Sequence, residues 1–181
     1  LHRRRHSFPT RRSSDLCHRF CNACQTQSSG HHHPQLSHHP HSDPSKAMTH
    51  AAIRQSLAHC KTIAVVGLSP KPHRDSFRVA KYMQDHGFRI VPINPNAHEV
   101  LGEKAYASLT EAAQHERIDM VNCFRNSEDI PPIAAEAIAI GAKSLWLQLG
   151  VVNDAAAKQA TEAGLVVVQD KCLMVEHRQL R

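Results

Sequence analysis

Aromatic residues and glycines are scarce in this sequence, and each scarcity excludes something. Only 4% of the 181 residues are Phe, Trp or Tyr, so the chain offers few rings on which nucleic-acid bases can stack. Glycine occurs seven times and no G-x-G-x-x-G run is present, which removes the usual dinucleotide fingerprint. No apolar run approaches the roughly 20 residues that span a bilayer. We therefore expect neither a nucleic-acid partner nor a membrane segment.

Positive charge is in excess, but it is concentrated at one end of the chain. The formal charge is +6. Residues 1–46 carry seven Lys/Arg against two Asp/Glu, whereas residues 47–181 carry fifteen against fourteen. The second part is therefore nearly neutral, and a basic nucleic-acid-binding face is not implied.

Residues 1–46 are rich in Arg, His, Ser and Pro, which predicts a disordered tail ahead of a folded domain at 47–181. Cys17, Cys21 and Cys24 precede a run of histidines, a spacing that resembles a zinc site. No strand or knuckle pattern surrounds them, so we favour the interpretation that no metal binds. Residues 1–16 resemble translated sequencing-adapter sequence, Met48 is a candidate start, and we assign the tail no function.

The remaining cysteines are isolated in the sequence. Cys60, Cys123 and Cys172 each lie in an apolar setting. Such cysteines are typical of reduced thiols, and this predicts a cytoplasmic protein.

Five short apolar segments alternate with helical patterns after residue 60. The expected strands cover residues 63–66, 88–93, 118–124, 144–149 and 165–169. Alternating strands and helices predict an α/β fold, a Rossmann-like five-stranded parallel sheet with helices on both faces. Numbered along the chain, the expected strand order is 3-2-1-4-5.

Residues 62–83 combine a β-branched strand, a turn at Gly67 and the start of a helix near Ser76. Helix N-termini have unpaired N–H groups and partial positive charge, so this arrangement suits a phosphate. Lys71, Arg74 and Arg78 add full charges nearby. The stretch therefore predicts a phosphate-binding loop.

Ligands of open parallel sheets bind at the carboxyl ends of the strands, near the switch in strand order. The segments expected there are residues 67–76, 94–95, 124–125, 148–150 and 170–172. Each has an ordinary structural alternative, and Trp146 is expected in the core. A nicotinamide dinucleotide normally needs an acidic residue after the second strand. Asn94 and Pro95 stand there instead, which favours a ligand with a phosphorylated ribose.

These segments together resemble one family. The motifs are VVGLSP at 65–70 with RDS at 74–76, VPINP at 91–95, SL at 108–109, FRxSED at 124–129, WLQLG at 146–150 and DKC at 170–172. They look like the small stand-alone CoA-binding proteins (the YccU-like family), which resemble the CoA-binding domain of the succinyl-CoA synthetase α subunit. The resemblance covers roughly residues 50–180.

The resemblance implies a CoA-binding domain with named contacts. Gly67, Ser69, Lys71, Arg74 and Ser76 would meet the phosphates of the ADP part. Asn94 and Pro95 would flank the adenosine, and Phe124 and Arg125 would line the neighbouring wall. Residues from Gln148 to Gly150 would approach the pantetheine arm.

No nucleophile beside a base, metal site or acid–base pair occurs at a credible spacing. The sequence therefore favours a binder of CoA or acyl-CoA without its own chemistry. Two alternatives stay open: an NADP-dependent oxidoreductase, and a nucleotide-binding subunit of an acyl-CoA ligase or transferase with a protein partner. Cys172 is either packed or forms a mixed disulfide with the CoA thiol.

Overall fold

A computed structural model describes residues 44–181, with side chains from residue 48 on. The expected disordered tail and its cysteine–histidine cluster fall outside the described residues, apart from the first turn of α1. That helix is α1 (Pro44–Ala58). Within the described residues, no helix is both long enough and apolar enough to cross a membrane.

The predicted parallel sheet is confirmed. Its five strands are β1 (Thr62–Val66), β2 (Arg89–Ile93), β5 (Met120–Cys123), β6 (Ser144–Leu147) and β7 (Val166–Val168). All neighbouring pairs are parallel. The strand order is β2-β1-β5-β6-β7, which is 2-1-3-4-5 when these five strands are numbered along the chain.

The predicted order 3-2-1-4-5 is therefore wrong, because the third strand pairs with β1 rather than with β2. Ile63 of β1 stands opposite Met120 of β5. The outer edge of β2 is occupied by the segment that follows it: Tyr106 donates its N–H to Pro92 O and accepts the Asn94 N–H, both at 2.9 Å. Pro92 also lacks an N–H, and proline in a sheet is confined to edge strands.

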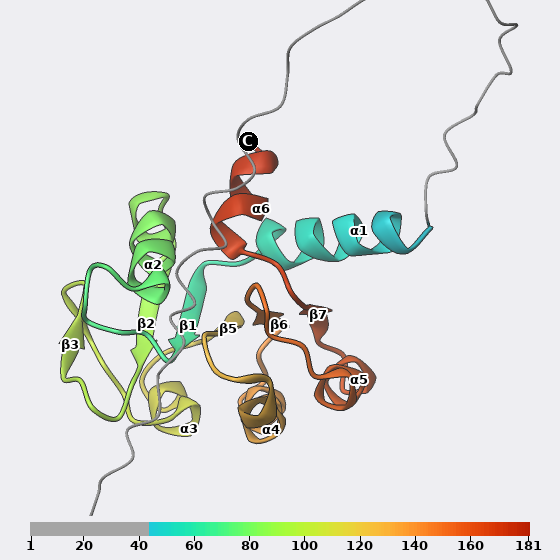
Figure 1. The fold of residues 1–181 in the computed structure, drawn as a ribbon. Coiled ribbons are helices and arrows are strands. Elements are labelled where there is room, and N and C mark those ends of the chain that lie inside the picture. Colours follow the sequence, from blue (N-terminus) through green and yellow to red (C-terminus); the bar gives the residue numbers. More distant parts are fainter. Residues whose placement is uncertain (1–43) are drawn as a thin grey trace, which may run out of the picture. The chain divides into compact units, whose positions relative to one another are not determined.

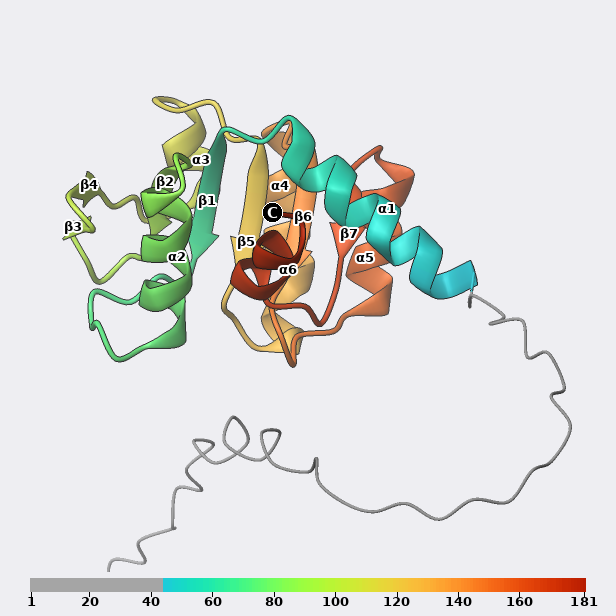
Figure 2. The same ribbon diagram turned by 90° about the horizontal axis from the view of Figure 1, so that it is seen from above.

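Helices cover both faces of the sheet, as predicted. They are α2 (Asp75–Asp85), α3 (Leu109–Ala113), α4 (Ile130–Ala139), α5 (Asp154–Glu162) and α6 (Leu173–Gln179), in addition to α1. Figure 1 shows α3, α4 and α5 on one face and α1, α2 and α6 on the other. In Figure 2, which looks down on the second face, α1 crosses the strands obliquely.

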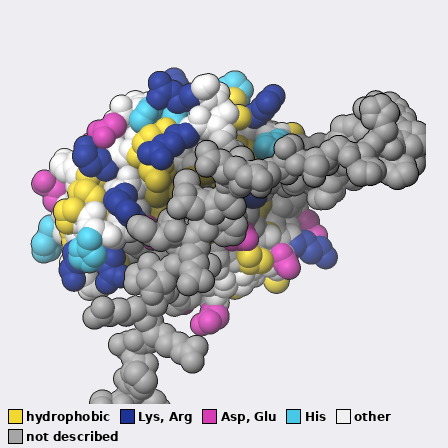
Figure 3. All heavy atoms as spheres, turned by 45° about the horizontal axis from the view of Figure 1, so that its top comes forward, with side chains coloured by type: hydrophobic (Ala, Val, Ile, Leu, Met, Phe, Trp, Pro, Cys, Tyr) yellow, Lys and Arg dark blue, Asp and Glu magenta, His cyan; other side chains and the backbone are white. Residues whose placement is uncertain are grey.

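Each face has its own core because strand side chains alternate between faces. Ile63 and Val65 of β1 pack with the core under α1, α2 and α6, whereas Ala64 and Val66 pack with the core under α3, α4 and α5. Trp146 is fully buried in the first of these cores, as expected. The outer surface over α1, α2 and α6 mixes basic, acidic, His and apolar side chains (Figure 3).

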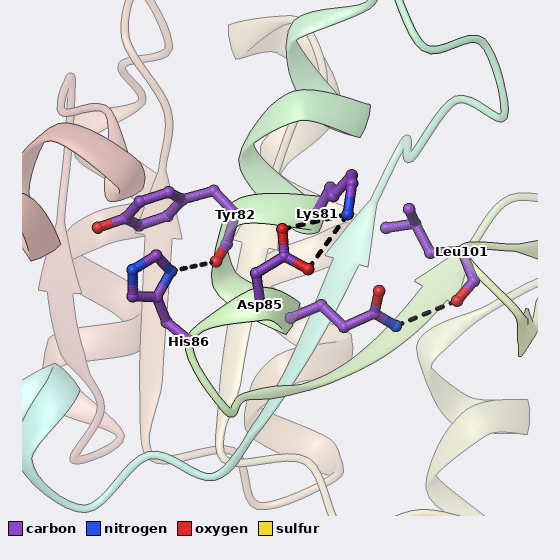
Figure 4. A network of polar contacts seen from close by, with 6 residues as sticks. Lys81, Tyr82, Asp85, His86 and Leu101 are labelled. Atoms are coloured by element: carbon purple, nitrogen blue, oxygen red, sulfur yellow. Dashed lines mark hydrogen bonds and ion pairs between the residues drawn. The ribbon is translucent and has the colours of Figure 1, made fainter.

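Two short elements escaped prediction. One is a hairpin of β3 (Glu99–Val100) and β4 (Glu103–Lys104), in the segment that follows β2. Gln84 Nε2 donates to the carbonyl of Leu101 at the hairpin turn, 3.1 Å away, and so ties the hairpin to α2 (Figure 4). A 3-10 turn, η1 (Ser127–Asp129), precedes α4.

Candidate functional site

A cleft of about 560 Å³ opens at the carboxyl ends of β1, β2 and β5. In the observed order the chain leaves β1 toward β2 and later returns to the other side of β1, so β1 and β5 flank the switch point. Crevices of open α/β sheets form at this position. The lining comprises Val66, Gly67, Ser69, Ile93, Asn94, Pro95, Asn96, Ala107, Ser108, Leu109, Arg125, Glu128, Asp129, Pro132, Ile133 and Glu136.

Gly67 brings the first loop against the end of β5. Its φ is +82°, and a Cβ there would lie 2.7 Å from the carbonyl oxygen of Phe124 and 3.2 Å from Cδ of Arg125. The Gly67 N–H donates to the carbonyl of Ile93, 3.0 Å away. The loop backbone is thus held between β2 and β5, and only glycine meets both the positive φ and the close approach.

The loop between β1 and α2 is organised by two serines. The Ser69 N–H donates to Ser76 Oγ at 3.1 Å, and Ser69 Oγ accepts the Lys71 N–H at 3.2 Å. Ser76 is buried, so it supports the loop from behind. Lys71 is exposed at the loop surface.

The N-terminus of α2 is open. Arg74 occupies the N-cap position in an extended conformation, and no side chain caps the helix. The N–H groups of the first turn therefore keep their hydrogen-bonding capacity. Asp75 in that turn is paired with Arg78, but Lys71 and Arg74 make no ion pair with the described residues. Two uncompensated cations thus stand beside the open helix end.

Asn94 joins the loops that follow β1 and β2. Its Nδ2 donates to the carbonyl of Leu68 at 2.9 Å, and its Oδ1 accepts the Asn96 N–H at 2.9 Å. Both ends of the amide are therefore committed within the protein. Pro95 is exposed beside it.

Arg125 follows β5 and lies across Gly67. Its guanidinium is 3.2 Å from the carboxylate of Asp129, and both side chains are partly exposed. Glu128 and Glu136 line the same wall of the cleft. Thr110 donates to Glu136 Oε2 through its N–H and its hydroxyl, each at 3.2 Å. The side of the cleft formed by α4 is consequently acidic, and the cations gather at Arg125 and the first loop.

Gln148, Gly150 and Phe124 are at the same sheet edge but outside the cleft lining. Gln148 is 4% exposed, and its Nε2 donates to Asn122 Oδ1 at 2.8 Å. The Gly150 N–H donates to Asp170 Oδ1 at 2.6 Å. The Phe124 ring packs against the core under α1, α2 and α6. The buried amide of Gln148 at the end of the fourth predicted strand thus has a hydrogen-bond partner, as buried polar groups normally do.

The structure gathers five of the eleven sequence-predicted site residues in the cleft lining: Gly67, Ser69, Asn94, Pro95 and Arg125. Ser76 stands behind Ser69, and Lys71 and Arg74 are on the adjoining loop. The acidic wall was missed. Its signal was the pair Glu128 and Asp129 in the turn before α4, three and four residues after Arg125.

Burial raises the pKa of two cysteine thiols in the core. Burial, with a smaller contribution from Asp119, raises the pKa of Cys60 to about 12. Burial alone raises the pKa of Cys123 to about 12. The described residues contain no group of three or more His, Cys, Asp or Glu placed to hold a metal ion.

The fold and the cleft define a Rossmann-like α/β protein with a cleft at the switch in strand order. Residues 61–178 match the family described as CoA binding domain, and the chain belongs to that family.

Several relatives share most of the chain. The uncharacterized protein YneT of Bacillus subtilis (strain 168) is 44% identical over 135 residues, which are 75% of this chain and 96% of that protein. A hypothetical protein from Pyrococcus horikoshii OT3 has a solved structure that is 40% identical, with a TM-score of 0.68, and the match covers 72% of this chain and 91% of that one.

A larger relative matches over a smaller part. Acetate–CoA ligase (ADP-forming) II of Archaeoglobus fulgidus is 29% identical over 91 residues. The match covers 49% of this chain and 13% of the ligase. The domain of this chain is therefore related to one segment of a much longer enzyme.

Proposed function

We propose that the chain binds CoA, or an acyl-CoA, with the ADP part of the ligand in the cleft. The observation that carries the proposal is the cleft of Gly67, Ser69, Asn94 and Arg125 at the switch point of a chain that belongs to the CoA binding domain family.

The phosphates would lie at the first loop. The open N-terminus of α2 offers N–H donors and the favourable end of the helix dipole. Lys71 and Arg74 add two cations that no carboxylate of the described residues neutralises. Ser69 and Ser76 hold the loop in this conformation through the bond between the Ser69 N–H and Ser76 Oγ.

The adenosine would lie deeper in the cleft, where the lining becomes apolar. Ile93, Leu109 and Ile133 provide that surface, and Asn94 and Pro95 border it. The committed amide of Asn94 cannot replace the carboxylate that accepts both ribose hydroxyls in NAD-binding sheets. This favours CoA over NAD.

The pantetheine arm would leave the cleft past the ends of β5 and β6. Phe124, Gln148 and Gly150 stand in that direction along the sheet edge, and we assign them to the arm. Because the side chain of Gln148 is buried and bonded to Asn122, its contribution would be to shape the surface under the arm.

Isothermal titration calorimetry of the full chain with CoA tests the proposal, with NADP as the comparison ligand. We expect CoA to bind and NADP to bind much more weakly. Arg74→Ala should weaken CoA binding about tenfold, since one charge-assisted phosphate contact is worth roughly 1.5 kcal/mol. Arg117→Ala is the matched control, because Arg117 is an exposed arginine before β5, at the opposite edge of the sheet.

The results separate the alternatives. CoA binding that is weakened in the Arg74 variant and unchanged in the Arg117 variant supports the proposal. Tighter binding of NADP than of CoA would favour the oxidoreductase alternative. Equal losses of CoA affinity in the two variants would contradict the assignment of the phosphates to the first loop.

A role as the CoA-binding part of an acyl-CoA ligase is the second candidate, favoured by the similarity to a segment of the Archaeoglobus enzyme. Affinity purification of the chain from its native cells, followed by mass spectrometry, tests this role. Recovery of a ligase catalytic subunit would support it, and recovery of the chain alone would count against it.

A further inference from the structure

The ion pair between Arg125 and Asp129 lines the cleft. The two groups are 3.2 Å apart, with side chains 51% and 38% exposed. No hydrogen bond of the Arg125 side chain to another described residue accompanies the pair. The guanidinium therefore has donors to spare, and its partner is held only by an exposed electrostatic contact.

Asp129 is the N-cap residue of α4, and its side chain makes no capping bond. An N-cap carboxylate accepts from the N–H of the second or third helical residue, but Pro131 and Pro132 stand at these positions and have no N–H. The carboxylate is therefore not committed to the helix, and it contacts Arg125 of the preceding loop.

Arg125 in turn is next to the proposed phosphate position. Its Cδ would lie 3.2 Å from a Cβ on Gly67, so the arginine covers the turn from which the first loop departs. A ligand phosphate at this loop would come within reach of the guanidinium. Two anions, one from the protein and one from the ligand, would then share one arginine.

We propose that Asp129 occupies the place of a ligand phosphate on Arg125, and that binding exchanges the carboxylate for the phosphate. This inference rests on the proposed function and adds a determinant of ligand class. An exposed carboxylate pair is weak, whereas a phosphate offers more charge and a bidentate geometry for arginine. The exchange admits phosphorylated ligands and leaves Arg125 closed to simple carboxylates.

The exchange predicts an unusual gain of affinity on removing a carboxylate. Asp129→Asn keeps the size and the helix-start preference of the residue but frees Arg125. Calorimetry with CoA should show roughly three- to tenfold tighter binding, since an exposed pair and its repulsion of the phosphate are both removed. Inorganic pyrophosphate, used as a second probe, should show the same direction of change.

Glu128→Gln is the matched control. Glu128 is one residue away, lines the same cleft and makes no ion pair with Arg125. The same charge is removed in both variants, so a general electrostatic effect would tighten binding equally. Arg125→Gln provides the second control, because Asp129→Asn should lose its special effect when the arginine is absent.

Each outcome decides a different point. Tightening by Asp129→Asn that exceeds Glu128→Gln and disappears in the Arg125→Gln background supports the exchange. Unchanged or weaker binding in Asp129→Asn, while the wild-type chain binds CoA, overturns the exchange and leaves the proposed function standing. Binding of pyrophosphate with the predicted pattern, but not of CoA, would keep the exchange and remove the proposed function. Binding of neither probe would overturn both.

Discussion

Gly67 and Phe124 are in a contact that no other residue at position 67 allows, because a Cβ on Gly67 would lie 2.7 Å from the Phe124 carbonyl oxygen. The contact joins the carboxyl ends of β1 and β5, the two strands that flank the switch point. It therefore fixes the floor of the cleft by backbone packing alone.

Gly67→Ala should be more destabilising than the same change at another glycine with positive φ. We expect a loss of roughly 2–4 kcal/mol, from the left-handed conformation and the backbone clash together. Gly164 has φ +94° and open space around it, so Gly164→Ala should cost only about 1–2 kcal/mol. Denaturant unfolding followed by the fluorescence of Trp146, the single tryptophan, measures both. Equal losses would mean that the loop backs away from β5 at little cost.

The strand order shows where sequence reasoning failed and why. Hydrophobic patterning located every strand of the main sheet, because each is short and mostly apolar. Patterning does not say which strands are neighbours. Pro92 carried that information: a strand with proline belongs at an edge, and the predicted order would have placed it between two strands.

The position of several cleft residues at strand ends was predicted, for a related reason. Residues at strand ends were found because parallel strands deliver their carboxyl ends to one edge. The commitment of Asn94 to the backbone of Leu68 and the pairing of Arg125 with Asp129 depend on side-chain geometry. No sequence pattern specifies such partners. Glu128 and Asp129 stand close to Arg125 in the sequence, but their place in the wall of the cleft appeared only in three dimensions.

Gln148 and Asn122 form a buried amide pair whose contribution to stability can be measured with single and double variants. Asn122 is 1% exposed, and its Nδ2 has no hydrogen-bond partner. Gln148→Ala should cost about 2–3 kcal/mol, because it also leaves Asn122 Oδ1 unpaired. The double variant Asn122→Val/Gln148→Leu should recover part of this loss, since replacing both partners by apolar groups removes the unpaired atoms. Thermal unfolding by calorimetry compares the three proteins.

The same double variant tests the assignment of Gln148 to the ligand arm. A folded double variant with weakened CoA binding would show that the amide shapes the surface under the arm. Wild-type affinity in that variant would restrict Gln148 to a structural role.

The three described cysteines should differ in reactivity toward iodoacetamide. The thiolate is the reacting form, and a pKa of about 12 keeps Cys60 and Cys123 protonated at pH 8. Cys172 is only partly buried and follows β7 at the sheet edge of the cleft. We therefore expect Cys172 to be labelled first, as mapped by peptide mass spectrometry. Slower labelling of Cys172 in the presence of CoA would show that the ligand arm reaches it, and faster labelling of Cys60 would contradict the burial argument.

We expect His177 to make the fold sensitive to mild acid. It lies on α6 against α2, where Nδ1 is 3.1 Å from the hydroxyl of Tyr82 and the ring meets Phe88 edge-on. Burial lowers the pKa of His177, and the neighbouring His86 and Arg181 lower it further. Figure 4 shows His86 turned back toward the carbonyl of Tyr82, so His86 is held beside the aromatic cluster.

The sign of the pH effect follows from where the proton binds. An unfolded histidine titrates near pH 6.5, and folded His177 titrates lower, so below that pH the unfolded chain takes up a proton that the folded chain refuses. Stability therefore falls as the pH drops from 7 toward 5. The pKa of Glu116 is lowered chiefly by its hydrogen bond with Arg89, so protonation of Glu116 reduces stability only below about pH 4.5. The pH ranges in which His177 and Glu116 affect stability are thus separate.

His177→Gln should flatten this dependence. Glutamine keeps a polar group near Tyr82 but does not titrate, so the melting temperature should change less between pH 7 and pH 5 than in the wild-type chain. Exposed His98 provides the matched control, and His98→Gln should leave the wild-type dependence of the melting temperature on pH unchanged.

Because α2 also forms the open helix end beside Lys71 and Arg74, loosening of the His177 contact would reach the cleft through that helix. This connection would be demonstrated if CoA affinity declined with pH in parallel with stability, and only while His177 is present. If the melting temperature of His177→Gln fell with pH as steeply as that of the wild-type chain, the acid sensitivity would belong to other groups.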